Sequence, residues 1–419
     1  MSEPAVKSER RFGYAERTKY CRSEVVMPPT LSVVIPTRER ALYLGHAIRT
    51  CLQSNRQDFE VLVLDNASTD NTSEVVAAIP DSRIRYERNE IRLSMRDNFE
   101  KGIDSSRGEI ICFIGDDDGL LPNAIDQSMS IFERYAVDAL SAARAAYCWP
   151  DLLTERRNTA LLPRGKGISI LNSRSALLHL LNDCDYYRLP CLYHGFVRRS
   201  IVDRVRRSQT RFFLSSQVDM FSSIALSMEN VPYAFSRSPL VVNGASKRSN
   251  GAAHFGGGGT QEKTLWKKED DLGFLPGFDQ SLSVGSLIIE SALRYSQAHQ
   301  ISICSMLDVK SIEKAAEYEL ALRRQVDRPD DEIRQFRRSL EGVLSTNLAR
   351  KTISFPRARR VNRLFKTFLH ARPIDFESKH ITNVYEGALY LDRIMMANLT
   401  GFLHSPLEQV TTALRMAKR

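Results

Sequence analysis

Between residues 31 and 135 the chain alternates short apolar segments with longer segments that carry apolar residues at helical spacing. The apolar segments LSVVIP (31–36), FEVLVLD (59–65) and EIICFIG (109–115) are predicted strands, and RIRYER (83–88) is a more exposed one. Helices are predicted at 39–55, 68–79, 94–106 and 121–135. Because alternating strands and helices form a parallel sheet with helices on both faces, the sequence predicts an α/β fold.

Polar residues follow three of these strands at the point where each strand ends. In parallel α/β sheets, ligands bind beyond the carboxyl ends of the strands. We therefore expect the three polar groups to converge on one ligand site. The groups are Pro36-Thr37-Arg38, Asp65-Asn66 and Asp116-Asp117-Asp118.

The third group places three carboxylates side by side, and adjacent carboxylates repel one another. They can point to one spot only if a cation neutralises them, and oxygen ligands of this kind select Mg²⁺ or Mn²⁺. The alternative is a solvated acidic turn in which the aspartates stabilise the start of the next helix. The triplet alone does not decide between a metal site and an acidic turn.

Composition narrows the class of protein. The 419 residues exceed one typical core, and the net charge of +9 suits an anionic partner such as a nucleotide, a nucleic acid or an acidic membrane. Seven scattered cysteines without a CxxC pair favour reduced thiols. No long apolar run and no signal-peptide core occur, so we expect a cytoplasmic protein, with peripheral contact at the inner face of the membrane still open.

Four motifs in a fixed order give a more specific signal than any one of them. They are LSVVIPTRER, VLVLDNASTDNT, NEIRLSMRDNFEKGI and GEIICFIGDDDGLLP. With these motifs the sequence resembles the family 2 glycosyltransferases, closely over residues 31–125 and more loosely to about 250. The resemblance implies a GT-A nucleotide-diphospho-sugar transferase fold, a Rossmann-like mixed sheet flanked by helices.

The resemblance also implies roles for individual residues. Pro36, Thr37 and Arg38 would line the base and ribose pocket, and Asp65 would accept hydrogen bonds from the base or ribose. The other nucleotide-sugar-binding residues implied are Arg96, Asn98, Asp116 and Asp117. Asp117 and Asp118 are the implied ligands of Mn²⁺ or Mg²⁺. The implied reaction is transfer of the sugar, with inversion, to a hydroxyl of a glycan, polysaccharide or lipid-linked acceptor.

Three positions depart from the family pattern. Gly115 stands where the first aspartate of the Asp-rich motif is usual, Arg38 where an aromatic residue is usual, and Glu90 where a glycine is usual. The first departure leaves undecided which of Asp117 and Asp118 is the main metal ligand.

Asp219, in FFLSSQVDMFSSIAL, is the candidate catalytic base for the acceptor hydroxyl, since it opens an apolar helix well downstream of the Asp triplet. The alternative is that this residue only caps the helix.

Two further segments carry polar chemistry. His194, beside a glycine, is either a contact to acceptor or phosphate or a structural residue. The segment 241–260 is predicted to be a flexible loop, in which Ser246, Lys247, Ser249 and His254 would close over the diphosphate or simply face solvent.

Beyond about residue 270 the pattern is mainly helical. The predicted organisation is a flexible segment 1–30, a GT-A domain 31–270 and a mainly helical domain 271–419. The basic segment 350–366 would contact anionic lipid, an anionic glycan or another subunit, or form a solvated helix face.

The main hypothesis is therefore a metal-dependent inverting glycosyltransferase. A catalytically degenerate GT-A binding protein is one alternative. A nucleotidyltransferase is another, although the glycine-rich phosphate loop that it needs is missing after the first strand. No nucleic acid is expected as a partner, because no nucleic-acid-binding motif is found.

Overall fold

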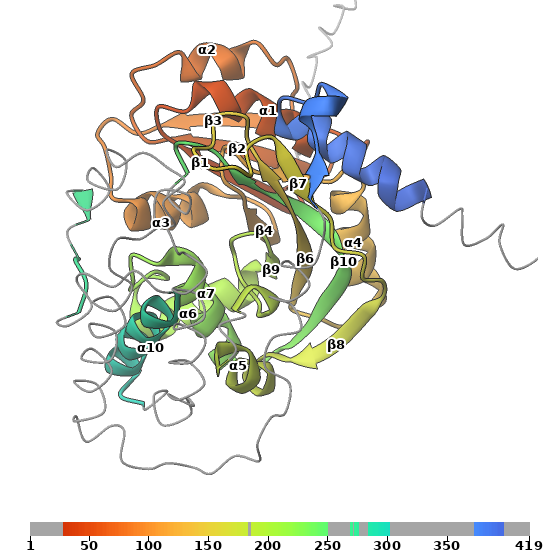
Figure 1. The fold of residues 1–419 in the computed structure, drawn as a ribbon. Helices are drawn as coiled ribbons and strands as arrows, with labels where there is room; N and C mark the ends of the chain where they lie inside the picture. Colours follow the sequence, from red (N-terminus) through yellow and green to blue (C-terminus); the bar gives the residue numbers. More distant parts are fainter. Residues whose placement is uncertain are drawn as a thin grey trace, which may run out of the picture.

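The computed structural model describes residues 28–182, 186–249, 269–270, 272–275, 284–301 and 373–397. Its described strands form one mixed sheet of eleven strands, with helices on both faces (Figure 1). Most of the sheet follows the order β11-β7-β6-β9-β4-β1-β2-β3, and β10 pairs with β5, β6 and β8. The strands are β1 Leu31–Thr37, β2 Phe59–Asp65, β3 Ile84–Arg88, β4 Ile110–Phe113, β5 Gly119–Leu120, β6 Ala139–Cys148, β7 Thr159–Leu161, β8 Ile168–Asn172, β9 Phe196–Arg198, β10 Pro232–Ala245 and β11 Ile374–Asp375.

The helices lie close to the predicted segments in the first half of the chain, although most are shorter by a few residues at each end. They are α1 Ala41–Cys51, α2 Thr72–Ala77, α3 Met95–Ser105, α4 Ala124–Arg134, α5 Ser173–Asn182, α6 Arg199–Gln209, α7 Val218–Met228 and α10 Val284–His299, with the 3₁₀ turns η1 Tyr186–Arg188 and η3 Glu377–Lys379. Residues 384–397 are helical as well.

The parallel part of the sheet is the part that the apolar runs predicted. β1 pairs in parallel with β2 and with β4, and β2 pairs in parallel with β3. β9 is antiparallel to β4 and β6, while β10 is antiparallel to β5 and β8 and parallel to β6. The sheet is therefore mixed, as the family resemblance implied, rather than purely parallel.

Each face of the sheet has its own hydrophobic core, because successive strand side chains point to opposite faces. Val34 and Leu62 pack with residues of α3, α6, α7 and α10 on one face. Val33 and Val61 pack with residues of α1 and α4 on the other face. Both faces of β1 and β2 are thus buried, which explains their unbroken apolar runs.

β10 corrects one prediction. Residues 241–245, predicted to begin a flexible loop, are the last five residues of this strand, and they pair with β5 and β6. A β-carbon on Gly244 would lie 1.8 Å from the carbonyl oxygen of Asp117, so only glycine allows the strand to lie against that residue. The glycine that suggested a loop is needed for close backbone packing.

The described parts of the range 271–419 pack against the rest of the fold. α10 belongs to the same core as α7, and Phe376 and Val384 share a third core with Tyr147 and Trp149. In Figure 1 the segment 373–397 lies beside α1 and β7. A domain boundary at 271 stays a prediction, and the basic segment 350–366 lies outside the described residues. Within the described parts of the chain, no helix has the length and apolarity needed to cross a membrane.

Candidate functional site

Residues 116–118 form a buried turn between β4 and β5, at the edge where the parallel strands β1, β2 and β4 end. The end of β1 contacts this turn directly, because the Thr37 hydroxyl donates a 2.7 Å hydrogen bond to Asp116 Oδ2. The end of β2 places Asp65 at the neighbouring position, in register with Thr37. The structure therefore brings together polar residues from the ends of adjacent strands.

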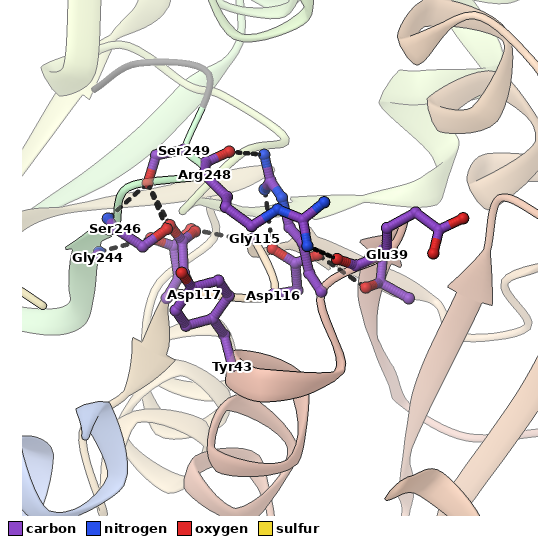
Figure 2. Close-up of polar contacts among 12 residues, drawn as sticks. Glu39, Tyr43, Gly115, Asp116, Asp117, Gly244, Ser246, Arg248 and Ser249 are labelled. Carbon is purple, nitrogen blue, oxygen red and sulfur yellow. Dashed lines mark hydrogen bonds and ion pairs between the residues drawn. The ribbon is translucent and has the colours of Figure 1, made fainter. Parts of the chain in front are cut away.

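Asp116 is paired with an arginine. Arg40 Nη1 lies 3.0 Å from Asp116 Oδ1, and a second Arg40 nitrogen donates to the Arg248 carbonyl oxygen (Figure 2). Arg248 in turn donates to the Glu39 carbonyl oxygen. Burial disfavours the charged guanidinium, but the carboxylates of Asp116 and Asp117 outweigh burial and raise the pKa of Arg40. Arg40 thus supplies a fixed positive charge beside the turn.

Asp117 is held by hydroxyl groups and by an indole. Ser246 Oγ donates to Asp117 Oδ2 at 2.7 Å, and Ser249 Oγ donates to the same oxygen (Figure 2). Trp149 Nε1 donates to the Asp117 carbonyl oxygen at 2.8 Å. Burial, and then the neighbouring charge of Asp118, raises the pKa of the Asp117 carboxyl to about 6. Within the described part of the chain, side-chain hydrogen bonds reach Asp117 only at Oδ2.

Asp118 differs from its two neighbours because four donors surround it. Oδ2 accepts hydrogen bonds from the Gly115 N–H, the Tyr193 hydroxyl and His194 Nε2, each at 2.6 Å, and Oδ1 accepts one from the Gly244 N–H at 2.7 Å. Burial raises its pKa, but His194, Tyr193 and the Gly244 N–H outweigh burial and lower it. Asp118 therefore ties β10 and the segment before β9 to the turn.

The same contacts explain the glycine at 115. A β-carbon there would lie 2.8 Å from both Asp118 Oδ2 and the Tyr193 hydroxyl oxygen. An aspartate at this position would collide with both groups. The departure from the family pattern at Gly115 is thus coupled to the inward orientation of Asp118.

His194 is a buried partner of Asp118. Its backbone has φ +65°, and its N–H donates to the Phe113 carbonyl oxygen at 2.8 Å. Burial lowers the pKa of His194 below its usual value despite the Asp118 charge, so the neutral ring donates from Nε2. Through these contacts His194 supports the aspartate turn.

Asp65 lies buried at the end of β2. Its Oδ2 accepts from the Tyr86 hydroxyl at 2.6 Å, and its Oδ1 accepts from the Ser68 N–H at 2.9 Å. These two bonds fix the carboxylate at the edge of the sheet where β1 and β4 also end.

Asn98 belongs to a network of buried amides. Asn89 Nδ2 donates to Asn98 Oδ1 at 2.8 Å and to Asn66 Oδ1 at 2.9 Å. The Leu93 N–H also donates to Asn66 Oδ1, at 2.8 Å. The network orders the segment that joins β3 to α3, next to the end of β2.

The other predicted nucleotide-binding residues lie around this edge. Pro36 is half-buried in β1, and Arg38 forms an ion pair with Glu269. Arg96 is buried on α3, with its Nε 3.7 Å from Asp97 Oδ1. Lys247 is exposed, and its backbone N–H donates a hydrogen bond to Asp151 Oδ1 at 3.4 Å. His254 lies outside the described residues.

Asp219 lies inside the first turn of α7. The residue that caps this helix is Gln217, which makes no side-chain capping hydrogen bond. Asp219 Oδ2 accepts a 2.6 Å hydrogen bond from the Tyr186 hydroxyl, and Oδ1 accepts from the Met220 N–H at 2.8 Å. Cys191 Sγ donates to the Asp219 carbonyl oxygen at 3.4 Å, and Tyr193, two residues further along, donates to Asp118 Oδ2. The segment 191–193 therefore contacts both the start of α7 and the aspartate turn.

Sequence reasoning missed three residues of this site, namely Arg40, Trp149 and Tyr186. Arg40 had a signal, because it follows Arg38 by two residues in the same motif. Trp149 and Tyr186 had none, since they reach the site from the end of β6 and from η1 only through the tertiary fold.

Several known proteins are similar to this chain in sequence or in structure. Residues 32–191 match the family model described as Glycosyl transferase family 2. The chain is 36% identical over 104 residues to the GalNAc(5)-diNAcBac-PP-undecaprenol beta-1,3-glucosyltransferase of Campylobacter jejuni, covering 24% of this chain and 34% of that protein. It is 25% identical over 138 residues to the putative colanic acid biosynthesis glycosyl transferase WcaA of Escherichia coli, covering 32% and 50%.

The chain thus spans a third to a half of the length of these curated relatives. Among solved structures, residues 1–349 of S. aureus TarS in complex with UDP-GlcNAc align with a TM-score of 0.44 and 12% identity, over 82% of this chain and 99% of that one.

Proposed function

We propose that residues 32–191, which match the Glycosyl transferase family 2 model, form a glycosyltransferase domain with the GT-A fold, and that the protein transfers a sugar from a nucleotide-diphosphate donor to an acceptor hydroxyl. The observation that carries the proposal is the buried aspartate turn 116–118 at the carboxyl ends of β1, β2 and β4. Ligands of α/β sheets bind at this edge. Thr37, Asp65 and Asp116 would there contact the base and ribose.

A divalent cation fits Asp117 better than Asp118. The four hydrogen bonds to Asp118 occupy its oxygens, whereas burial and the Asp118 charge raise the pKa of Asp117 despite the positive charge of Arg40. In the described residues no three His, Cys, Asp or Glu side chains form a metal-binding cluster. A site with one protein carboxylate, completed by donor phosphates, is usual for Mg²⁺.

We therefore propose Asp117 as the main ligand of Mn²⁺ or Mg²⁺. Such a cation stabilises the negative charge that grows on the leaving diphosphate. Arg40, fixed beside Asp116, would add a second positive charge at the same place.

Asp219 is the proposed general base. Its carboxylate would accept the proton of the acceptor hydroxyl, while that oxygen forms a bond to the anomeric carbon and the bond to the diphosphate breaks. Attack from the side opposite to the leaving group inverts the anomeric centre. The Tyr186 hydrogen bond would hold Asp219 in one orientation during this step.

The acceptor that we propose is a membrane-anchored glycan. The Campylobacter relative is named as a glucosyltransferase of a saccharide linked through diphosphate to undecaprenol, and this relative is the basis for proposing a lipid-linked acceptor. The protein would then bind at the inner face of the membrane. Flotation with vesicles that contain anionic lipid is expected to recover the full chain, whereas neutral vesicles are expected to leave it behind.

Calorimetric titration with UDP, GDP and dTDP, with and without Mn²⁺, tests the donor site. We expect one nucleotide to bind in a Mn²⁺-dependent way, and Asp117→Ala to abolish the metal dependence. Asp219→Asn is expected to bind that nucleotide normally and to lose transfer.

Absence of binding for all three nucleotides would overturn the proposed function. Full turnover by both Asp117→Ala and Asp219→Asn would instead overturn only the assignment of residues.

A further inference from the structure

A row of contacting side chains leads from the sheet to Asp219. The Arg144 guanidinium lies over the Tyr187 ring at 4.1 Å from its centroid, and the Tyr187 and Tyr186 ring centroids are 4.0 Å apart. The Tyr186 hydroxyl donates to Asp219 Oδ2 at 2.6 Å. β6, η1 and α7 thus place one cation, two aromatic rings and one carboxylate in sequence.

The charge of Arg144 has an unusual environment. Arg85 and Arg198, on other strands of the sheet, pair with Glu60 and Glu109 at 2.9 and 2.5 Å. No carboxylate of the described residues forms an ion pair with Arg144, and its interactions there are with Tyr187 and, electrostatically, with Tyr186, Cys191 and His194. A guanidinium group has five N–H donors. For a half-buried guanidinium, the strongest hydrogen bonds are those to a negatively charged oxygen, as in a carboxylate or a phosphate.

The contacts of Arg144 connect it to the proposed acceptor site rather than to the proposed donor site. Its row ends at Asp219, the proposed base for the acceptor hydroxyl, and contains two aromatic rings. The positive charge next to Asp116 and Asp117, where donor phosphates would lie, is that of Arg40. Aromatic walls with a few oriented polar groups are typical of small-ligand sites.

We propose that Arg144 and Tyr187 form an acceptor subsite that binds a carboxylate or phosphate group on the acceptor sugar, next to the hydroxyl that Asp219 would deprotonate. This inference rests on the proposed glycosyl transfer. It makes the natural acceptor an acidic saccharide, with a uronic acid or a sugar phosphate at its growing end.

The test uses the full-length protein with Mn²⁺ and the nucleotide that it binds, titrated with glucuronate, glucose 6-phosphate and neutral glucose. We expect at least one acidic sugar to bind about fivefold or more tightly than glucose, the gain typical of a partly exposed ion pair of good geometry. Arg144→Gln is expected to remove the preference and leave nucleotide affinity unchanged. Arg144→Lys is expected to keep part of it.

Arg134→Gln is the matched control, because Arg134 also lies over a tyrosine ring, 5.5 Å from the centroid of Tyr135, but at the end of α4. It should keep the full preference. Thermal melting of each variant shows that its fold is intact.

Two results would overturn the inference: wild-type protein that binds neither acidic sugar more tightly than glucose, or an Arg144→Gln variant that loses nucleotide affinity as well. Both results count only if the wild type binds its nucleotide normally. If the wild type binds none of the nucleotides, that separate result overturns the proposed function.

Discussion

At the scale of single residues, three adjacent aspartates have three different environments. Asp116 is paired with Arg40, Asp117 accepts hydrogen bonds from serine hydroxyls, and Asp118 accepts four hydrogen bonds that lower its pKa. Identical side chains in sequence therefore differ in charge stability because each points to different neighbours. Burial and the neighbouring Asp118 charge disfavour the charged form of Asp117 and raise its pKa to about 6.

This environment predicts how stability changes with pH. The folded-state pKa of Asp117, about 6, exceeds its ordinary value of 3.8, so the folded protein holds a proton that the unfolded chain releases between these values. Wild-type protein should lose stability as the pH rises through this window. In metal-free buffer at pH 7.5, we expect Asp117→Asn to raise the free energy of unfolding by about 1–3 kcal/mol.

Urea unfolding of both proteins at pH 4 and pH 7.5 measures the effect, which should vanish at the lower pH. Glu90→Gln, an exchange of the same chemistry at an exposed position, is the control and should change little. An Asp117→Asn protein that is no more stable than the wild type at pH 7.5 would contradict this account of the turn.

Tyr186 gives a prediction about the proposed base. Tyr186→Phe removes the 2.6 Å hydrogen bond to Asp219 Oδ2 but keeps the ring. Because the carboxylate is then no longer held in one orientation, kcat in steady-state kinetics should fall about tenfold, while nucleotide affinity stays unchanged. Tyr385→Phe, whose hydroxyl contacts Gln53 instead, should leave kcat unchanged. An unchanged kcat in Tyr186→Phe would show that Tyr186 does not position Asp219.

At the scale of elements, β10 completes the site from a distant part of the chain. Its last residues lie against the aspartate turn, and Gly244 donates to Asp118 Oδ1. The strands β1, β2 and β4 were predictable because each is an apolar run buried on both faces. The end of β10 was not, since Asn243, Gly244 and Ala245 have no strand pattern and pair only because β6 lies beside them.

Gly244→Ala tests how closely this strand packs. The added methyl group would lie 1.8 Å from the Asp117 carbonyl oxygen, a distance that forces backbone atoms apart. We expect a loss of about 3 kcal/mol in stability, measured by urea unfolding, together with loss of nucleotide binding. Asn243→Ala, at the preceding residue, adds no atoms and should cost far less. Equal stability of both variants would contradict the observed packing.

At the scale of the whole molecule, the segment 373–397 supports the site indirectly, by packing against a residue that holds the aspartate turn. Phe376 is fully buried in the third core with Tyr147 and Trp149, and Trp149 holds the Asp117 carbonyl. The sequence located the first polar groups of the site through its ordered motifs. It did not reveal this support, because the apolar residues of 373–397 carry no sign of which surface they cover.

Phe376→Ala should therefore affect both stability and the site. Removal of a fully buried aromatic ring is expected to cost about 3–5 kcal/mol in urea unfolding. Weaker nucleotide affinity at temperatures where the variant is still folded should accompany that loss, because the ring packs in the same core as Trp149. Leu42→Ala removes an aliphatic side chain that is 71% exposed and should change neither property. Unaltered stability of Phe376→Ala would show that this segment does not support the sheet.

The indole of Trp149 has a practical consequence. The chain contains two tryptophans, Trp149 and Trp266, and the first donates its N–H to the backbone of the aspartate turn. A Trp266→Phe protein would hold a single indole fluorophore, bonded to the backbone of Asp117, the residue whose carboxylate is expected to meet the cation. Its emission would then follow donor and metal binding in real time, without any label attached to the protein.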